Sequence, residues 1–384
     1  MLHVLSIDKV ILNVPVSYIS VKEWINKNDN ECKARFIFLD SPVEIIENPP
    51  MVVGHHISAR FIRNYRRSSK EAFVGIIPKA KVFGEFSNII ITPDNQVLLD
   101  VSREFGAEGG KKVENFSVFH KRLGMPKVQY AKGRIAVIST CGSNNFHHWN
   151  FDVLPRLHLL KRAGIFDEID KFIIHYEGYN FQKEGLRKLN IVPDKIINPK
   201  HNSNFYIQAE VLYVPSLTED LGTISPWVVS FLRNTFLINE KKPINSDRIF
   251  LSRKNVSTRK IINQEQVSEE LMKRGYTEFV PEDFTMEEVA EYFSKAKSIV
   301  SVHGSGLSNL PFINENTKVL DIMDPYHQDA YYWMICNNRK AKYVALFSEG
   351  MHPDDNLDLV KNKINKDLYI DIDKFKQALD LISK

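Results

Sequence analysis

The stretch that decides the fold is TMEEVAEYFSKAKSIVSVHGSGLSN, residues 285–309. Thr285 and Glu288 have the spacing of a capping box, and the apolar residues that follow recur at helical spacing, so we predict a helix that packs on a core. Asn263 and Gln266 have the same spacing before an earlier apolar stripe. After the helix, the run SIVSV predicts a strand. Helices and strands that alternate in this way indicate a parallel sheet covered by helices.

The turn after this strand, HGSGLSN, contains His303, two glycines and Asn309. Glycines permit positive φ and a close approach of another molecule to the backbone, and a helix that follows offers free N–H groups. Together these features favour an anion, most often a phosphate. Asn309 replaces the third glycine of the dinucleotide fingerprint, however, and the Gly-Lys-Ser/Thr ending of the P-loop is missing. A tight connection with a buried histidine is the alternative interpretation.

Outward from this stretch, strand and helix patterns alternate on both sides of a bridging helix, SPWVVSFLRNTFLI. Short β-type runs separated by turn residues precede them, and an amphipathic helix ends the chain. We therefore expect an α/β protein with two Rossmann-like domains. The predicted divisions are a β-rich N-terminal region at 1–130, a first Rossmann-like domain at 131–224, a second at 225–345, and a tail at 346–384 that packs back on the body.

The composition is that of an ordinary globular protein, since 51 basic and 47 acidic residues leave a formal net charge of +4 over 384 residues. This balance argues against a nucleic-acid binder and suits a negatively charged small substrate. The three cysteines lie far apart without metal-ligand spacing, so we predict neither a disulfide framework nor a zinc site. The N-terminus lacks the pattern of a signal peptide, and no apolar run is long enough to span a bilayer. We expect a cytoplasmic protein.

The densest basic cluster is ARFIRNYRRSSK, residues 59–70. We interpret it as a solvated helix face, because charge runs usually are. The alternative is a peripheral contact with anionic lipid at the inner face of the membrane, or with an acidic glycan.

A second functional stretch is FLSRKNVSTRK, residues 250–260. Ser252 and Arg253 lie at the end of a predicted strand, and Arg259 follows in the loop. The planar fork of arginine suits diphosphate oxygens, and several cations beyond a strand end would neutralise charge on a leaving diphosphate. In open α/β sheets, ligands bind beyond the carboxyl ends of strands. A solvent-exposed basic loop is the alternative.

A third stretch, NNFHHWNFDVLPRLHLL at residues 144–160, predicts an amphipathic helix. His148 and Asp152 are four residues apart, so their side chains share a face near the beginning of the helix. They could act as a general base and its orienting partner, or the carboxylate could itself be the base. Alternatively, Asp152 only satisfies the helix dipole. Pro155 predicts a kink or a later start of the helix.

Four motifs in order, HHWNFDVLPRL, IFLSRKNVSTRKIINQEQV, FTMEEVAEYFSKAKSIVSVHGSGLSNLPF and TKVLDIMDP, resemble those of the family 61 glycosyltransferases, and we place the chain with the bacterial capsule and lipopolysaccharide branch. The resemblance covers about residues 80–325. It implies a GT-B fold, in which two Rossmann-like domains face a cleft, with residues 1–224 on the acceptor side and 225–345 on the donor side. It also implies inversion, no metal and no cofactor. The donor would be a nucleotide-sugar, which we expect to be UDP-linked, and the acceptor a glycan or lipid-linked glycan.

The resemblance also implies roles for residues at matching positions. Asp152 and His148 would lie on the acceptor side, with Asp152 as the base that His148 orients or replaces. Asp321, at the end of the strand KVLDI, would bond the ribose hydroxyls. The residues that would hold the donor are Ser252, Arg253, Arg259, His303, Gly304, Ser305, Gly306, Asn309 and Asp321.

The sequence departs from the family pattern at two places. Val289 stands where the family usually has glutamine in the helix before the glycine turn. Ser305 and Ser308 replace the alanine and threonine of the common turn sequence, which bears on which sugar is accommodated.

Three other functions were weighed. A metal-dependent transferase would hold Mg²⁺ or Mn²⁺ through closely spaced acids, and the nearest candidate is DID at residues 371–373. An NAD-type dehydrogenase is suggested by Asp324, about 20 residues beyond the glycine turn, where a ribose-binding acid would be expected. A non-catalytic module that senses a nucleotide or glycan would use the same cleft.

Overall fold

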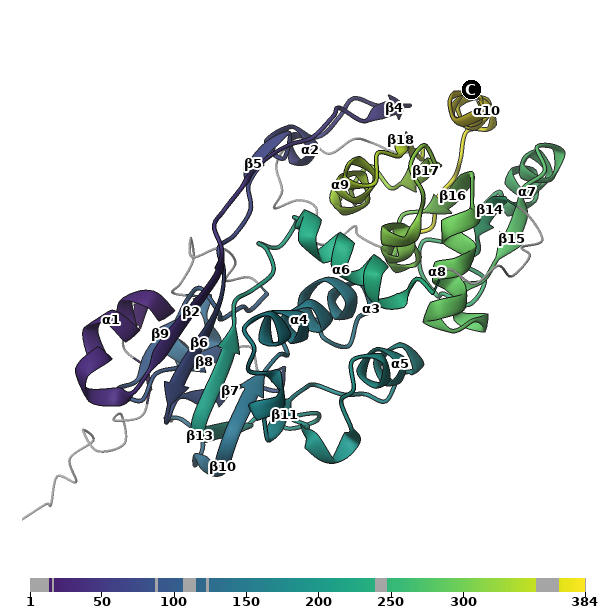
Figure 1. The fold of residues 1–384 in the computed structure, drawn as a ribbon. Coiled ribbons are helices and arrows are strands. Elements are labelled where there is room, and N and C mark those ends of the chain that lie inside the picture. The colour runs from purple at the N-terminus through teal and green to yellow at the C-terminus, as the bar shows by residue number, and fades with distance from the viewer. Residues whose placement is uncertain are drawn as a thin grey trace, which may run out of the picture. The chain divides into compact units, whose positions relative to one another are not determined.

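The computed structural model consists of two compact units (Figure 1). Unit 1 comprises Met1–Val43 and Lys70–Leu221, and unit 2 comprises Glu44–Ser69 and Gly222–Lys384. The structure describes residues 14–15, 17–86, 89–105, 115–121, 124–238, 247–349 and 366–383. Parts of the predicted N-terminal region, 1–13, and of the predicted tail, 350–365, lie outside the described residues.

Unit 1 is built on a ten-stranded mixed sheet. Its longest strand, β13, runs parallel to β10 and antiparallel to β6 and β7, and the parallel strands β11 and β12 continue the sheet beyond β10. The strands are β1 (Ser17–Ile19), β2 (Arg35–Asp40), β6 (Ala72–Pro78), β7 (Lys81–Phe83), β8 (Ile89–Ile91), β9 (Gln96–Leu98), β10 (Gln129–Val137), β11 (Lys171–Ile173), β12 (Ile196–Ile197) and β13 (Tyr206–Pro215).

The helices of unit 1 include α1, whose apolar face joins the core of the sheet through Val21, Trp24 and Ile25. A continuous helical segment follows β10 and changes from α to π and back to α. The helices are α1 (Val21–Cys32), η4 (Ser117–His120), α3 (Phe146–His148), η5 (Trp149–Val153), α4 (Leu154–Arg162), η6 (Phe166–Glu168), α5 (Asn180–Lys188) and η7 (Pro193–Lys195).

Unit 2 is built on a six-stranded sheet in the order β15-β14-β16-β17-β18-β4, with every neighbouring pair parallel. A separate antiparallel pair joins β3 to β5. The strands are β3 (Glu44–Ile46), β4 (Met51–Val53), β5 (Arg66–Ser68), β14 (Arg248–Leu251), β15 (Thr277–Phe279), β16 (Ser298–Val302), β17 (Lys318–Met323) and β18 (Lys342–Phe347).

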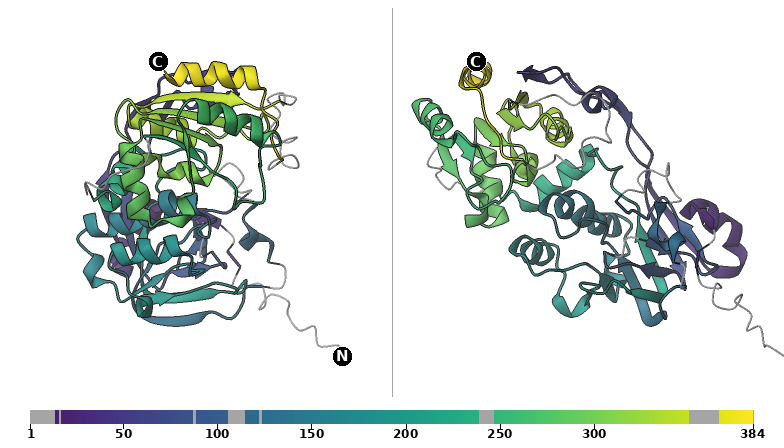
Figure 2. Two further views of the ribbon diagram at one scale, coloured as in Figure 1. Left: turned by 90° about the vertical axis from the view of Figure 1, so that its right-hand side faces the viewer. Right: turned by 180° about the vertical axis from the view of Figure 1, so that it is seen from behind.

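The helices of unit 2 cover this sheet. The terminal helix α10 buries Phe375, Leu379 and Ile382 in one apolar cluster with Val344 and Leu346 of β18, and Figure 2 shows this yellow helix lying across the strands of the unit. The helices are α2 (Ala59–Arg63), α6 (Pro226–Phe236), α7 (Gln264–Lys273), η8 (Pro281–Asp283), α8 (Met286–Lys295), η9 (Ser305–Phe312), α9 (Tyr331–Asn338) and α10 (Ile372–Ser383).

The α/β class predicted from the sequence is confirmed, but the N-terminal region does not stay together. Residues 44–69 belong to unit 2, where β4 adds a parallel strand beside β18 with Val52 opposite Ala345. The other short strands join the sheet of unit 1, since β6 and β7 pair with β13. The division at residues 1–130 is therefore corrected. Short β-type runs do not specify which sheet they join, because strand pairing depends on distant contacts.

The two predicted capping boxes have different outcomes. Thr285 caps α8 as expected, because its hydroxyl accepts from the N–H of Glu288 while the Glu288 carboxylate accepts from the N–H of Thr285. Asn263 makes no capping bond to α7. Its side-chain amide instead exchanges two hydrogen bonds with the backbone of Ile370, at 2.8 and 3.0 Å. This interaction attaches the segment before α10 to the start of α7.

Candidate functional site

The glycine turn follows β16 and leads directly into the 3-10 helix η9. Gly304 has an extended backbone, with φ 167° and ψ 177°, and neither Gly304 nor Gly306 lies in the left-handed region. The predicted positive φ is therefore wrong, whereas the close approach of another molecule stays a prediction. Gly304 leaves room for Arg253, because a Cβ atom there would overlap with the guanidinium and displace the end of that side chain. At Gly306 the nearest side-chain atom, Leu251 Cδ1, is 3.8 Å from such a Cβ, which leaves ordinary room.

Arg253 and Arg259 come together at this turn, as their position beyond the end of β14 predicts. Arg253 Nη2 donates to the carbonyl of Thr258 at 3.0 Å, and Arg259 Nη1 donates to the carbonyl of His303 at 2.6 Å. Arg259 has φ +57°, in the left-handed region. Such a conformation costs about 1 kcal/mol or more in a residue other than glycine, and it persists where the surrounding structure enforces it.

The two guanidinium groups lack compensation. Among the described residues, no carboxylate forms an ion pair with either, and both Nε atoms are buried without a hydrogen-bond partner. Burial and the neighbouring Arg259 charge lower the pKa of Arg253 to about 10, and burial also lowers the pKa of Arg259. Buried charges are normally paired. Two half-buried cations beside the glycine turn are therefore suited to an anionic ligand.

His303 is held by a chain of buried groups across three neighbouring strands. Its Nδ1 lies 2.9 Å from Asp321 Oδ2, and the Tyr343 hydroxyl donates to the same oxygen at 2.8 Å. Asp321 is completely buried. Its carboxylate therefore orients the imidazole, with Nδ1 as the donor, and leaves Nε2 for other contacts. The expected contact of Asp321 with ribose hydroxyls is corrected, because this side chain does not reach the surface.

The other residues expected to hold a donor lie around the same turn. Ser252 begins the loop after β14, and its Oγ accepts from the N–H of Lys254 at 3.2 Å. Ser305 is partly exposed at the beginning of η9. Asn309 is buried, and its amide donates to the carbonyl of Gly306 at 3.0 Å, which closes the first turn of η9. Ser252 and Ser305 are thus near enough to the surface for contact with a ligand, whereas Asn309 stabilises the turn.

Sequence reasoning missed a second histidine beside His303. The rings of His303 and His327 have centroids 5.3 Å apart, and His327 Nε2 lies 3.0 Å from Asp329 Oδ2. Arg60 donates to the other oxygen of Asp329. The signal was present in the sequence, since DPYHQD follows the strand KVLDIM of the same parallel sheet and must lie at its carboxyl edge.

His303, His327 and Asp329 could each offer a ligand atom to a metal ion, and these atoms lie within 4.8 Å of one another. Both carboxylate oxygens of Asp329 are already bonded, however, one to His327 and one to Arg60. Burial raises the pKa of Asp329, whereas the hydrogen bond from His327 and the neighbouring charges lower it. The net effect holds this pKa well below its usual range. The nearby arginines oppose a further cation. The arrangement fits a neutralised hydrogen-bonded cluster better than a metal centre.

Unit 1 carries the other predicted pair, on the helical segment after β10. His148 Nδ1 lies 2.7 Å from Asp152 Oδ2, as the four-residue spacing predicts. The helix widens to π geometry over Trp149–Val153, and the N–H of Leu154 bonds the carbonyl of Trp149, five residues back. Pro155, which has no N–H to donate, lies in the first turn of α4 immediately afterwards. The predicted kink is therefore a π-bulge, a feature often found at functional sites.

Asp152 has further partners that the sequence did not reveal. Arg103 Nη1 donates to its Oδ1 at 2.9 Å, and Thr218 Oγ1 donates to the same oxygen at 3.3 Å. Burial tends to raise the pKa of Asp152, but the Arg103 charge and the His148 hydrogen bond outweigh it and hold this pKa well below its usual range. Asp152 is therefore a poor proton acceptor. It is suited to orient His148 through Nδ1, which leaves the other ring nitrogen to exchange a proton.

Gly142 supports the imidazole of His148. It has φ +79°, and a Cβ atom there would lie 2.5 Å from His148 Cδ2. Glycine is thus required twice, for its backbone conformation and for its lack of a side chain. Phe105, which is 58% exposed, packs against the other side of the ring with centroids 5.8 Å apart.

The carboxylates on which the alternative functions depend accept hydrogen bonds from nearby backbone N–H groups. Asp371 accepts from the N–H groups of Asp373 and Lys374 and so caps α10. Asp324 is buried and accepts from the N–H of Tyr326 in the turn after β17. Neither carboxylate is thus presented to a metal or a ribose by this geometry.

The basic cluster at residues 59–70 is largely neutralised. Arg60 pairs with Asp329, Arg66 with Glu44 and Arg67 with Glu47. The pairing favours a structural interpretation over lipid contact. Within the part of the chain that the structure describes, no helix has the length and apolar character needed to cross a membrane.

Residues 146–320 match the model of the glycosyltransferase 61 family. The match spans a little under half of the chain, begins two residues before His148 and includes Arg253, Arg259 and the glycine turn. It supports the family resemblance drawn from the motifs, and with it a glycosyltransferase that uses a nucleotide-sugar donor and a glycan acceptor. A search of curated proteins found no match to the chain.

Proposed function

We propose that the protein is an inverting glycosyltransferase that binds the nucleotide-sugar donor on unit 2 and activates the acceptor on unit 1. The observation that carries this proposal is the pair of uncompensated arginines, Arg253 and Arg259, beside the backbone of Gly304. The family match to residues 146–320 supports the same activity. A GT-B arrangement, in which the two units close on one substrate pair, is part of the proposal.

On the donor side, the guanidinium groups bind the diphosphate oxygens. Arginine forks make charge-assisted hydrogen bonds to such oxygens, and a bound diphosphate would supply the negative charge that the described residues do not. His303, oriented by Asp321, offers its remaining ring nitrogen as a further donor. Cations already fixed at the turn stabilise the leaving diphosphate without reorganisation during the reaction.

On the acceptor side, His148 is the base and Asp152 is the residue that orients it. This assignment revises the expectation that Asp152 is itself the base, since Arg103 and His148 stabilise its ionised form. The acceptor hydroxyl gives its proton to His148 while its oxygen bonds the anomeric carbon. At the same time the bond from that carbon to the diphosphate breaks, and the diphosphate leaves with the electron pair. One displacement of this kind inverts the anomeric centre.

The arginines and histidines take the place that a divalent cation holds in metal-dependent transferases, so we propose that the reaction requires no metal. We also propose a UDP-linked donor and an acceptor that belongs to a bacterial surface polysaccharide, capsule or lipopolysaccharide, assembled on the cytoplasmic side of the membrane. The motif resemblance and the Lys-, Asn- and Ile-rich composition support these finer points.

The proposal is tested by calorimetric binding of UDP, GDP, CMP and NAD to the full chain, each with EDTA present. We expect one nucleoside diphosphate to bind, and Arg253→Ala to weaken it about 10- to 100-fold, as charged hydrogen bonds of about 1.5–3 kcal/mol predict. Lys254→Ala is the matched control, because it removes an exposed cation from the same loop. Binding of NAD alone, or binding only with a divalent ion, would contradict the proposal.

A further inference from the structure

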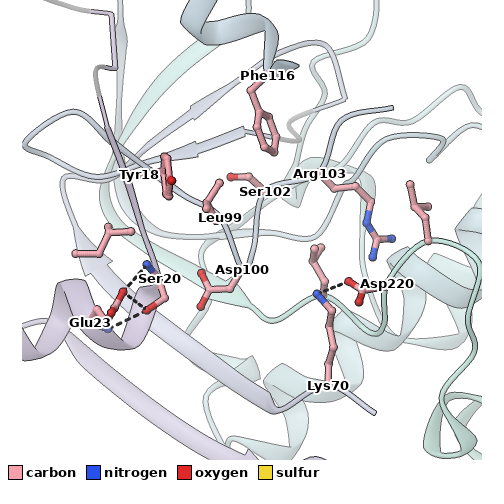
Figure 3. Close-up of a pocket in the computed structure, with 13 residues that line it drawn as sticks. Tyr18, Ser20, Glu23, Lys70, Leu99, Asp100, Ser102, Arg103, Phe116 and Asp220 are labelled. Carbon is pink, nitrogen blue, oxygen red and sulfur yellow. Dashed lines mark hydrogen bonds and ion pairs between the residues drawn. The ribbon is translucent and has the colours of Figure 1, made fainter. Parts of the chain in front are cut away.

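Unit 1 contains a pocket of about 410 Å³ that the assignments above do not use (Figure 3). The beginning of α1, the turn after β9 and the segment after β13 form its walls. Its volume is within the range of about 300–1,000 Å³ that small-molecule sites occupy. The polar residues that line it include Glu23, Lys70, Asp100, Arg103 and Asp220.

Donors and acceptors of hydrogen bonds alternate around this pocket. Figure 3 shows Asp100 between the Ser20–Glu23 pair and the Lys70–Asp220 pair. Lys70 Nζ lies 2.7 Å from Asp220 Oδ1, and Arg103 is buried at the far wall. Three carboxylates oppose an anionic ligand, whereas Lys70 and Arg103 oppose a cationic one. A neutral molecule with many hydroxyl groups satisfies both kinds of partner, because each hydroxyl can donate and accept.

Apolar surface completes the walls. Tyr18, with 55% of its surface exposed, and Phe116 both line the pocket, together with Leu99 and Leu217. Aromatic side chains present large flat apolar surfaces, and those of tyrosine also carry a polar end. Burial, which outweighs the hydrogen bonds from Val21, raises the pKa of Asp100 to about 6. A carboxyl group in such surroundings is suited to hydroxyl ligands rather than to a cation.

The pocket shares a wall with the pair assigned to proton transfer. Arg103 lines the pocket and donates to Asp152. Leu217 also lines it, and the next residue, Thr218, donates to the same carboxylate. Arg103 therefore contacts both the pocket and the His148–Asp152 pair.

We propose that this pocket binds a neutral sugar residue of the acceptor, adjacent to the residue that carries the attacking hydroxyl. The inference rests on the proposed function, and it adds a specific site and a chemical class for part of the acceptor. Tyr18 supplies a stacking face, and Asp100 accepts hydrogen bonds from hydroxyls of the sugar.

The test is saturation-transfer NMR on the full chain without nucleotide. The probes are methyl α-glucopyranoside, methyl β-galactopyranoside and the methyl β-glycoside of N-acetylglucosamine, at millimolar concentrations. We expect at least one to bind, and Asp100→Asn to weaken it about fivefold, since a charged hydrogen bond becomes a neutral one. Asparagine can still accept from Val21, so α1 keeps its start. Asp170→Asn is the matched control, because Asp170 also accepts a backbone N–H in unit 1 but lies outside the pocket.

Tyr18→Ala provides a second variant that removes only an exposed ring, and we expect it to weaken binding similarly. The inference is overturned if no probe binds, or if both variants bind as the parent does. Calorimetry with UDP on the same samples separates the two proposals. Nucleotide binding without sugar binding overturns the pocket assignment alone, whereas sugar binding without nucleotide binding supports the pocket and contradicts the donor site.

Discussion

Each unit of the molecule contains a histidine whose Nδ1 faces a carboxylate, but the surroundings of the two pairs differ. In unit 2, Asp321 is completely buried, bonds His303 and Tyr343, and lies behind a turn that carries two uncompensated arginines. In unit 1, Asp152 bonds His148, and Arg103 provides the countercharge, while the imidazole is 18% exposed. Under the proposed function, the same local pair serves ligand binding in one place and proton transfer in the other.

The two pairs differ mainly in where the nearest positive charge lies. We propose that this placement, more than the pair itself, decides whether a site binds a ligand or transfers a proton. Where the cations form no ion pair with a described carboxylate, they remain available to an anionic ligand. Where a cation is bonded to the carboxylate, the carboxylate remains ionised and orients the histidine. Each of the following variants removes one part of the difference between the two histidine–carboxylate pairs.

The largest effect is expected from His148→Ala, which removes the proposed base. We expect turnover at saturating donor to fall about a thousandfold, within the range of about 10²–10⁴ for general bases, while the nucleotide Kd stays unchanged. Steady-state kinetics together with calorimetry provide both numbers. His158→Ala, in α4 of the same helical segment, is the control. Near-normal turnover in His148→Ala would remove the distinction between the two pairs.

The next largest effect concerns Gly304, where the Arg253 side chain lies close to the backbone of the turn. Gly304→Ala places a methyl group where the Arg253 guanidinium lies, so the arginine must move. We expect nucleotide affinity to fall about tenfold, equivalent to one lost charged hydrogen bond. Gly306→Ala is matched in chemistry and has room for its methyl group, so its affinity should equal that of the parent. Equal behaviour of the two variants in calorimetry would contradict the assigned role of Arg253.

The smallest predicted effect concerns a third carboxylate, that of Asp100. The pKa of Asp100 is raised to about 6 by burial, and none of the described cations forms an ion pair with it as Arg103 does with Asp152. The folded state therefore holds a proton that the unfolded state releases at about pH 4, and stability falls as pH rises from about 4 to about 6. Relative to Asp100→Asn, the parent should lose about 2 kcal/mol of unfolding free energy across this window. Urea unfolding of both proteins at each pH measures it, and parallel pH profiles would contradict it.

Much of the fold and part of the site could be predicted from the sequence because their signals are local. The capping box at Thr285 and the glycine turn fixed one helix–strand unit, and the rule that ligands lie beyond strand ends joined Arg253 to His303. The partner of Asp152 could not be found in this way, since Arg103 lies 49 residues earlier and meets it only in the folded structure. The placement of β4 in unit 2 depends on equally distant pairing.

The roles of two further residues could not be predicted from the sequence either. The family resemblance implied that Asp321 contacts a ribose, but burial and the Tyr343 hydroxyl direct it to His303. Gly304 was expected to have positive φ. Its lack of a side chain instead leaves room for Arg253, which comes from a different loop. Both depend on which side chains meet in three dimensions.

The most direct test of the division of labour is to measure nucleotide Kd and turnover on Asp152→Asn and Asp321→Asn in parallel, with thermal unfolding to check that each variant folds. The account predicts that Asp152→Asn lowers turnover about a hundredfold with unchanged Kd, since the base loses its orienting charge. It predicts that Asp321→Asn weakens nucleotide binding through a misoriented His303. A reversed pattern, or identical losses in both variants, would contradict the account.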